Sequence, residues 1–251
     1  MHRRALALIL AVLVAGCRTA APPTARPGAT PAPPAGAAPT AARVEPDSIR
    51  WVRDAAEYRA AVLQTYRLVT AHVEREAAGR RAGSWAAVLD ADETVITNLT
   101  YQAERARAGL AYSTDSWAAW VRRREATPLP GAAAFLTRVR ALGGRIAIVT
   151  NRLGSECDDT IAVFTRDALV YDAMLCRPNG SPSDKNARFE AVQFGKTAAS
   201  ATPLDVVAFV GDNIQDFPGL SQKVKDAGEA GFAAFGTRFF VLPNPMYGSW
   251  Q

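Results

Sequence analysis

The sequence predicts an α/β fold: a doubly wound parallel sheet of the Rossmann-like kind with a small, mostly helical cap. From about residue 80 onward, short apolar runs alternate with longer segments of helical periodicity. This rhythm is typical of parallel strands joined by crossover helices. Acidic or hydroxyl residues follow three of the apolar runs, where an open parallel sheet has its ligand crevice.

The first expected element is a long helix over residues 50–78. Its apolar side chains recur at spacings of three and four residues and form one stripe. They are Tyr58, Val62, Tyr66, Val69 and Val73. Gly79 is placed to end the helix. We expect this region, about 50–80, and residues 98–128 to supply the helical cap elements.

Five apolar runs are expected to form the sheet. They are Trp85–Leu89, Arg145–Val149, Ala173–Cys176, Val206–Val210 and Phe239–Leu242, of which the third has the weakest pattern. Two helices are expected between them. One begins at Pro130 and ends at Gly143, and the other is capped by Ser183 and runs through Val192.

The first 46 residues have the features of targeting and spacing segments. A positively charged start precedes an apolar run over residues 5–16, which is too short to span a bilayer. The run ends at Cys17 in the sequence LVAGC, which resembles a bacterial lipobox. We therefore expect a lipoprotein signal peptide over residues 1–16 and a lipid-anchored Pro- and Ala-rich tether over 17–46. An ordinary secretory peptide with a chance cysteine is the alternative.

Charge and anchoring indicate where the protein works. The net charge of +5 falls to +3 once Arg3 and Arg4 leave with the signal peptide. No basic run is interleaved with aromatic residues, so we expect no nucleic-acid partner. The lipid anchor would be the only membrane attachment, in an extracytoplasmic location. Arg18 stands where Asp often marks retention in the inner membrane, which favours the outer membrane.

Two cysteines lie in the expected folded part, residues 47–251. In an oxidising compartment the isolated pair Cys157 and Cys176 is a candidate disulfide. Two free buried thiols are the alternative.

Two carboxylates stand two residues apart directly after the first predicted strand, in the segment DADET. Asp90 is placed to attack phosphorus as a nucleophile, while Asp92 protonates the leaving oxygen and later activates water. An acidic surface turn is the alternative for any such pair.

The next strand end carries groups suited to phosphoryl oxygens. Thr150 supplies a hydroxyl, and Asn151 and the backbone N–H groups around it add further donors. Lys185 lies in the first turn of a predicted helix, where its charge would neutralise the phosphoryl group and orient the nucleophile. A plain strand terminus and a surface lysine are the alternatives.

Two further carboxylates, Asp212 and Asp216, follow the buried strand 206–210. Together with Asp90 and the carbonyl of Asp92, they would form an oxygen-rich site for a hard cation. Mg²⁺ prefers such ligands. Phosphoryl transfer depends mostly on positioning and charge neutralisation, so the ion would carry much of the catalysis.

Several other classes of hydrolase lack their central residue. Beyond the signal peptide, His72 is the only histidine, and it lies inside the first predicted helix. This argues against histidine-nucleophile phosphatases, Ser-His-Asp hydrolases and zinc sites. Neither remaining cysteine is followed by an arginine at the spacing of a cysteine-phosphatase loop. An aspartate nucleophile is what remains.

The order D-x-D-x-T, strand-end Thr, Lys and G-D-x-x-x-D resembles the haloacid dehalogenase-like (HAD) superfamily. More specifically, the chain is similar to the class C acid phosphatases, the bacterial lipoprotein 5'-nucleotidase family. The matching segments are AEYRA at 56–60, DADET at 90–94, Ser116-Trp117 with Trp120-Val121, VTNR at 149–152, Lys185 with Ala187-Arg188-Phe189, FVGDN at 209–213 and LPNPMYGSW at 242–250.

The resemblance implies a HAD-like core with a helical cap, Mg²⁺ as cofactor and hydrolysis of a small phosphorylated substrate, a 5'-nucleotide. It implies the following roles: nucleophile Asp90, acid/base Asp92, phosphoryl contacts Thr150 and Lys185, and metal ligand Asp212. Asp216 would be a further ligand or would support the ligands from behind. The nucleotide base would lie between aromatic side chains, one of them Tyr247. Simple packing of the C-terminal segment is the alternative for Tyr247.

Two other functions stay open. The same site would serve a phosphotransferase that uses another acceptor, although phosphorylated metabolites are scarce outside the cytoplasm. A catalytically silent surface lipoprotein that binds a ligand is the other, although binding alone does not need the second carboxylate, Asp92. The sequence leaves open whether two copies form a homodimer.

Overall fold

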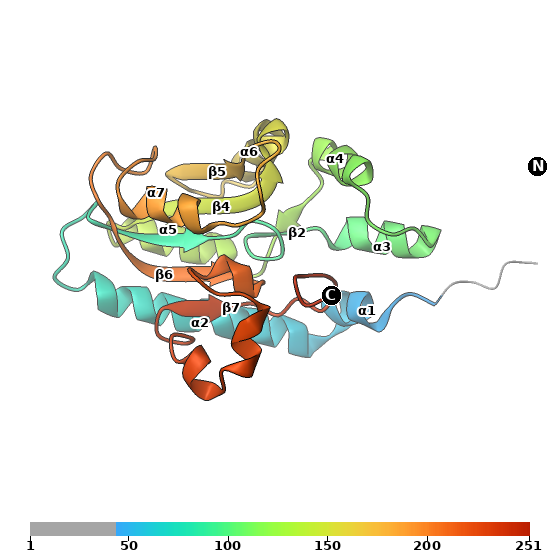
Figure 1. Ribbon diagram of the computed structural model, residues 1–251, viewed down its shortest axis with the longest axis horizontal. Coiled ribbons are helices and arrows are strands. Elements are labelled where there is room, and N and C mark those ends of the chain that lie inside the picture. Colours follow the sequence, from blue (N-terminus) through green and yellow to red (C-terminus); the bar gives the residue numbers. More distant parts are fainter. Residues whose placement is uncertain (1–43) are drawn as a thin grey trace, which may run out of the picture. The chain divides into compact units, whose positions relative to one another are not determined.

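A five-stranded sheet, all parallel, forms the centre of the protein (Figure 1). The computed structural model describes residues 44–251, so the expected signal peptide 1–16, Cys17 and nearly all of the tether 17–46 lie outside the described residues. The strand order is β5-β4-β1-β6-β7. The strands are β1 Trp85–Leu89, β4 Arg145–Leu153, β5 Ala173–Arg177, β6 Asp205–Gly211 and β7 Phe239–Val241. The predicted α/β fold is confirmed.

The central strand β1 is buried on both faces. Trp85 and Leu89 point into one hydrophobic cluster, and Ala86 and Val88 point into another. This double burial explains why β1 is a continuous apolar run rather than an alternating one.

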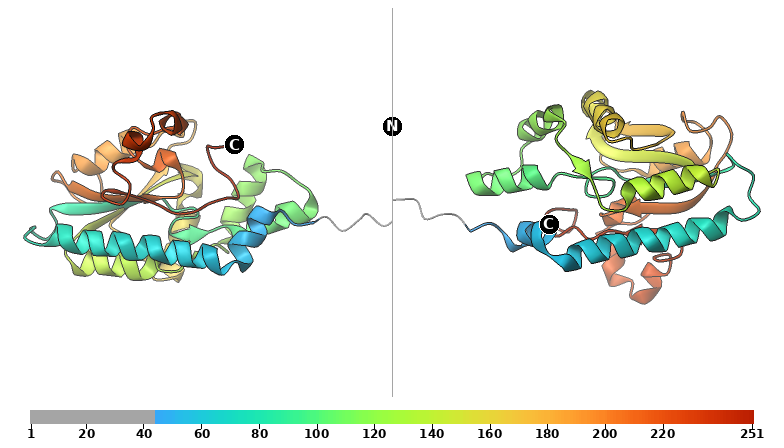
Figure 2. Two further views of the ribbon diagram at one scale, coloured as in Figure 1. Left: turned by 90° about the horizontal axis from the view of Figure 1, so that it is seen from below. Right: turned by 180° about the vertical axis from the view of Figure 1, so that it is seen from behind.

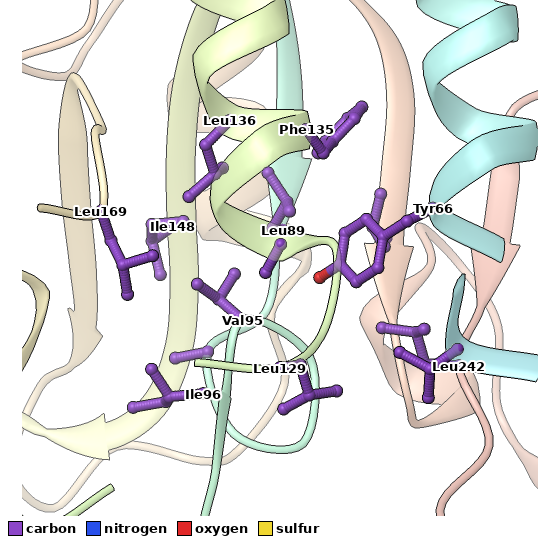
Figure 3. Close-up of a cluster of buried hydrophobic side chains, with 14 of the residues drawn as sticks. Tyr66, Leu89, Val95, Ile96, Leu129, Phe135, Leu136, Ile148, Leu169 and Leu242 are labelled. Carbon is purple, nitrogen blue, oxygen red and sulfur yellow. The ribbon is translucent and has the colours of Figure 1, made fainter. Parts of the chain in front are cut away.

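Helices α2 (Ala56–Ala77), α5 (Ala132–Ala141) and α6 (Cys157–Arg166) cover one face of the sheet (Figure 2). Figure 3 shows Tyr66 of α2, Leu89 of β1 and Phe135 of α5 in the hydrophobic cluster between these helices and the sheet. The expectation that residues 50–80 belong to the cap is therefore wrong for α2, because its apolar stripe packs on the sheet and on α5. The Tyr66 hydroxyl also donates to the carbonyl of Thr94 at 2.6 Å, which ties α2 to the loop after β1.

The other face is covered by α7 (Asn186–Gln193) and by side chains of the segment after β6, such as Phe217 and Phe235; that segment also contains three short 3₁₀ segments. These segments are η2 Ile214–Asp216, η3 Gln222–Asp226 and η4 Glu229–Phe232. Helix α7 begins later than the predicted cap Ser183. The Asp184 carboxylate accepts from the Asn186 N–H at 2.8 Å, and this local bond organises the first turn instead.

A small cap lies beyond one end of the strands (Figure 1). It contains α1 (Asp47–Asp54), α3 (Leu99–Ala108), α4 (Thr114–Arg123) and an antiparallel pair, β2 (Ile96–Thr97) with β3 (Thr127–Pro128). The predicted single helix over 50–78 is broken at Ala55, whose backbone is extended. The break lets α1 bury Ile49 and Val52 and pack on α3 instead of continuing along the sheet.

A disulfide joins Cys157, at the start of α6, to Cys176 on β5. It fixes the beginning of α6 beside the sheet. In the part of the chain that the structure describes, no helix combines the length and apolar character of a membrane span.

Candidate active site

The candidate residues meet at the carboxyl edge of the sheet. Asp90 follows β1, Asp212 follows β6, and Thr150 lies near the end of β4. Parallel strands place their carboxyl ends at one edge, and this brings together residues that are far apart in the sequence. Lys185 comes to the same edge from the start of α7.

Three carboxylates and one ammonium group form the centre of the site. Carboxylate oxygens of Asp90, Asp212 and Asp216 all lie within 4.8 Å of one another. Lys185 is only 3% exposed, and its ammonium group donates to Asp90 and, at 2.6 Å, to Asp216. Burial alone would lower the pKa of Lys185, but the charges of the two carboxylates outweigh it and raise that pKa.

The charges in this cluster do not balance, because one lysine faces three carboxylates. Burial, together with the charges of Asp216 and Asp90, raises the pKa of Asp212 well above its ordinary value. Burial also raises the pKa of Asp90, although Lys185 opposes that shift. An all-oxygen site with an excess of negative charge fits a hard divalent cation such as Mg²⁺. Asp90, Asp212 and Asp216 would hold it, and the expected carbonyl of Asp92 would add a neutral oxygen.

The close approach of Asp216 to β6 requires a glycine at position 211. A Cβ atom on Gly211 would lie 2.3 Å from the Asp216 Cβ and 2.4 Å from its Oδ2. Asp216 in turn accepts from the Asn213 N–H at 2.9 Å, which fixes the turn that carries it.

We expect Gly211→Ala to destabilise the protein by about 1–3 kcal/mol and to impair metal binding, since Asp216 must move. Urea unfolding and titration with Mg²⁺ would measure the two effects. Gly154→Ala is the matched control, because a methyl there would meet no atom closer than 3.6 Å. Equal stability of the two variants would contradict the steric argument.

The Asp92 side chain turns away from the carboxylate cluster and faces Arg152. The Arg152 Nε and Nη2 donate to Asp92 Oδ1 at 2.9 and 2.8 Å. Asn98 Nδ2 donates to the same oxygen at 2.8 Å. The two aspartates of the DADET segment, Asp90 and Asp92, thus have different surroundings, as a division of labour requires.

Glu93 is buried within the loop after β1, next to Asp92. It has a positive φ of 52° and accepts from the Asn98 N–H at 2.6 Å. Burial and the charge of Asp92 raise the pKa of Glu93 to about 8. The Tyr247 hydroxyl donates to its other oxygen. Tyr247, expected to contact substrate, is therefore linked to this loop through its hydroxyl.

The C-terminal segment, residues 242–250, forms two further hydrogen bonds with the loop after β6. Asn244 Nδ2 donates to Asp212 Oδ2 at 2.8 Å, and Ser249 Oγ donates to Asn213 Oδ1 at 2.7 Å. The segment therefore helps to orient the loop after β6.

Thr150 lies inside β4 rather than at its end, because the strand continues to Leu153 after an irregularity in its pairing with β5. The Thr150 Oγ1 accepts from the Arg152 N–H at 3.1 Å. Arg188 donates to the Thr150 carbonyl and, at 2.6 Å, to Asn151 Oδ1. Asn151 is thus oriented at the same edge by a cation.

Comparison with known proteins agrees with this geometry. Residues 36–250 match the family described as HAD superfamily, subfamily IIIB (acid phosphatase). The chain belongs to this family. It is also similar to the class C acid phosphatase from Bacillus anthracis, with 32% identity, a TM-score of 0.70, and coverage of 81% of this chain and 85% of the other. A tungstate-bound structure of the class C acid phosphatase from the same organism matches at 31% identity with the same coverage and TM-score.

This acid phosphatase contains site residues that sequence reasoning missed. They are Glu93, Asn98, Arg152, Arg188 and Asn244. Glu93 and Arg152 lie inside the recognised motifs, so their position was a usable signal. Arg188 and Asn244 also lie inside segments that carry the resemblance, whereas Asn98 contacts the site only through the fold, and no local pattern distinguishes it.

Proposed function

We propose that this acid phosphatase is a Mg²⁺-dependent enzyme that hydrolyses 5'-nucleotides through a phosphoryl group carried on Asp90. The observation that carries the proposal is the cluster of Asp90, Asp212 and Asp216 around Lys185, with Asp92 held apart from it. The tungstate bound to the Bacillus anthracis relative supports it, since tungstate is a tetrahedral oxyanion like phosphate.

The residues divide the reaction into two steps. An Asp90 oxygen attacks phosphorus while Asp92 gives a proton to the leaving oxygen, which departs as an alcohol. Asp92 then takes a proton from water as that water attacks phosphorus, and Asp90 is released as a carboxylate. Lys185 keeps Asp90 oriented. Bound Mg²⁺ would neutralise the charge on the phosphoryl oxygens.

Aromatic side chains near Asp92 support a nucleotide as substrate. Arg152, which binds Asp92, lies 5.5 Å from the centre of the Trp117 ring. The centre of the Trp117 ring lies 6.3 Å from the centre of the Tyr112 ring, and Tyr112 is 64% exposed. The exposed ring of Tyr112, together with the ring of Tyr247, suits stacking against a nucleotide base.

The proposed location is extracytoplasmic, with a lipid on Cys17 as the membrane anchor and the outer membrane as the favoured destination. The disulfide between Cys157 and Cys176 supports an oxidising compartment. There the enzyme would release phosphate from nucleotides at the cell surface, as a monomer or homodimer.

Removal of metal should lower phosphate release by about 10²-fold or more, because a bound cation contributes several kcal/mol of charge stabilisation. The assay measures phosphate from p-nitrophenyl phosphate after treatment with EDTA, and again after Mg²⁺ is restored. Full activity in EDTA would contradict the role of the metal.

A substrate panel tests the nucleotide proposal in the same assay. Nucleoside 5'-monophosphates and nicotinamide mononucleotide should give higher kcat/KM values than sugar phosphates. A preference for sugar phosphates would contradict it. Faster transfer to an added alcohol than to water would favour a phosphotransferase, and no turnover of any substrate would favour a binding protein.

A further inference from the structure

The two oxygens of the Asp92 carboxylate are hydrogen-bonded to different extents. Oδ1 accepts three hydrogen bonds of 2.8–2.9 Å, two from Arg152 and one from Asn98. Oδ2 accepts only one longer bond, 3.2 Å from Arg152 Nε. The Asp92 side chain keeps 16% of its surface exposed, whereas that of Arg152 keeps 1%. One oxygen is therefore engaged, and the other is left with its lone pairs largely free.

Arg152 is itself held from several elements. Its Nη1 donates to Thr160 Oγ1 on α6 at 3.2 Å, and its Nη2 donates to Asn98 Oδ1 at 3.0 Å. The same Asn98 oxygen accepts from Trp120 Nε1 of α4 at 2.8 Å. The planar fork of an arginine, fixed in this way, imposes both the position and the rotation of the carboxylate, which the point charge of a lysine would not do.

We propose that Arg152 is a positioning residue that aims Asp92 Oδ2 at the leaving oxygen of the substrate. The inference rests on the proposed function, in which Asp92 is the proton donor. The proton on Oδ2 passes to the leaving oxygen as its bond to phosphorus breaks, and Asp92 becomes a carboxylate. The fork then stabilises that carboxylate without rearranging, which is the advantage of a preorganised charge.

The test is a comparison of leaving groups. A good leaving group such as 4-nitrophenolate departs without help from an acid, whereas phenolate needs a proton. We expect Arg152→Gln to lower kcat/KM for phenyl phosphate at least about tenfold more than for 4-nitrophenyl phosphate. A merely structural loss would lower both values by the same factor, and that result would overturn the proposal.

Two further variants sharpen the outcome. Arg152→Lys keeps the positive charge but lacks the planar fork. It should therefore show the same increase in the ratio of kcat/KM for 4-nitrophenyl phosphate to kcat/KM for phenyl phosphate. A ratio equal to that of the wild type would mean that the charge alone suffices, and it would overturn the role of the fork. This variant also decides the case if Arg152→Gln does not fold. In an Asp92→Asn background, Arg152→Gln should add no further selectivity between the two esters, because its effect passes through Asp92. An additive effect would count against the proposal.

The matched control is Arg138→Gln on α5. Arg138 is exposed and pairs with Glu74, so this variant should leave kcat/KM unchanged for both esters. The wild-type enzyme separates the two proposals. No turnover of either ester by the wild type would refute the proposed function itself, whereas an active wild type with an unchanged ratio in the variants would refute only the role of Arg152.

Discussion

Asp90→Asn should lower the rate of phosphate release by roughly 10⁴-fold or more, the scale of loss when a covalent nucleophile is removed. Asparagine has nearly the same shape, so the core around β1 should be retained, but its amide cannot form the acyl phosphate. Single-turnover mixing with labelled substrate should show a phosphorylated wild-type protein and none for the variant. Circular dichroism would verify the fold.

The control for this variant is Asp205→Asn at the start of β6. Asp205 is exposed and pairs with Arg80, and it has no contact with the cluster. It should leave the rate within a factor of about two. An Asp90→Asn variant as active as this control would exclude Asp90 as the nucleophile.

The second large effect is expected for Lys185→Met. The substitution keeps the length of the side chain and removes a buried cation that two carboxylates contact. Loss of one partner from such a buried set costs about 3–5 kcal/mol, because the remaining charges stay uncompensated. Activity should fall by about 10²–10³-fold, as for the loss of one preorganised donor. Urea unfolding in EDTA and steady-state kinetics would measure the two effects.

Added Mg²⁺ should recover part of the lost stability of Lys185→Met, since the cation would neutralise the same carboxylates. Lys196→Met is the matched control. Lys196 is exposed beside Phe194, and its loss should change the free energy of unfolding by no more than about 0.5 kcal/mol. A Lys185→Met variant as stable as this control would show that the lysine does not balance the cluster.

The centre of the sheet could be predicted from the sequence because β1, β4 and β6 contain apolar runs that are buried on both faces. Trp85–Leu89 is predicted residue for residue, and β6 differs by one residue at each end. The break at Ala55 was not predicted, because the apolar periodicity of α2 has no local signal for where α1 turns toward the cap. Ser183 failed as a helix cap because Asp184, one residue later, forms the local bond.

The site could be predicted only as far as the motifs extend. Asp90, Asp212 and Asp216 follow buried strands, so their convergence follows from the topology of a parallel sheet. The direction of the Asp92 side chain did not follow, because it depends on Arg152 and Asn98. Arg152 is 60 residues from Asp92 along the chain and reaches the loop from β4, whereas Asn98 is 6 residues away, directly before α3.

The central place of β1 in the sheet has a consequence for how activity appears during folding. Its neighbours β4 and β6 both come later in the sequence, and a contact such as that of Thr94 with Asp212 spans 118 residues. Closing such long loops is slow compared with forming helices. In a refolding experiment, the circular dichroism of the helices should therefore return before enzymatic activity. The delay between the two would measure how long β6 takes to dock onto β1.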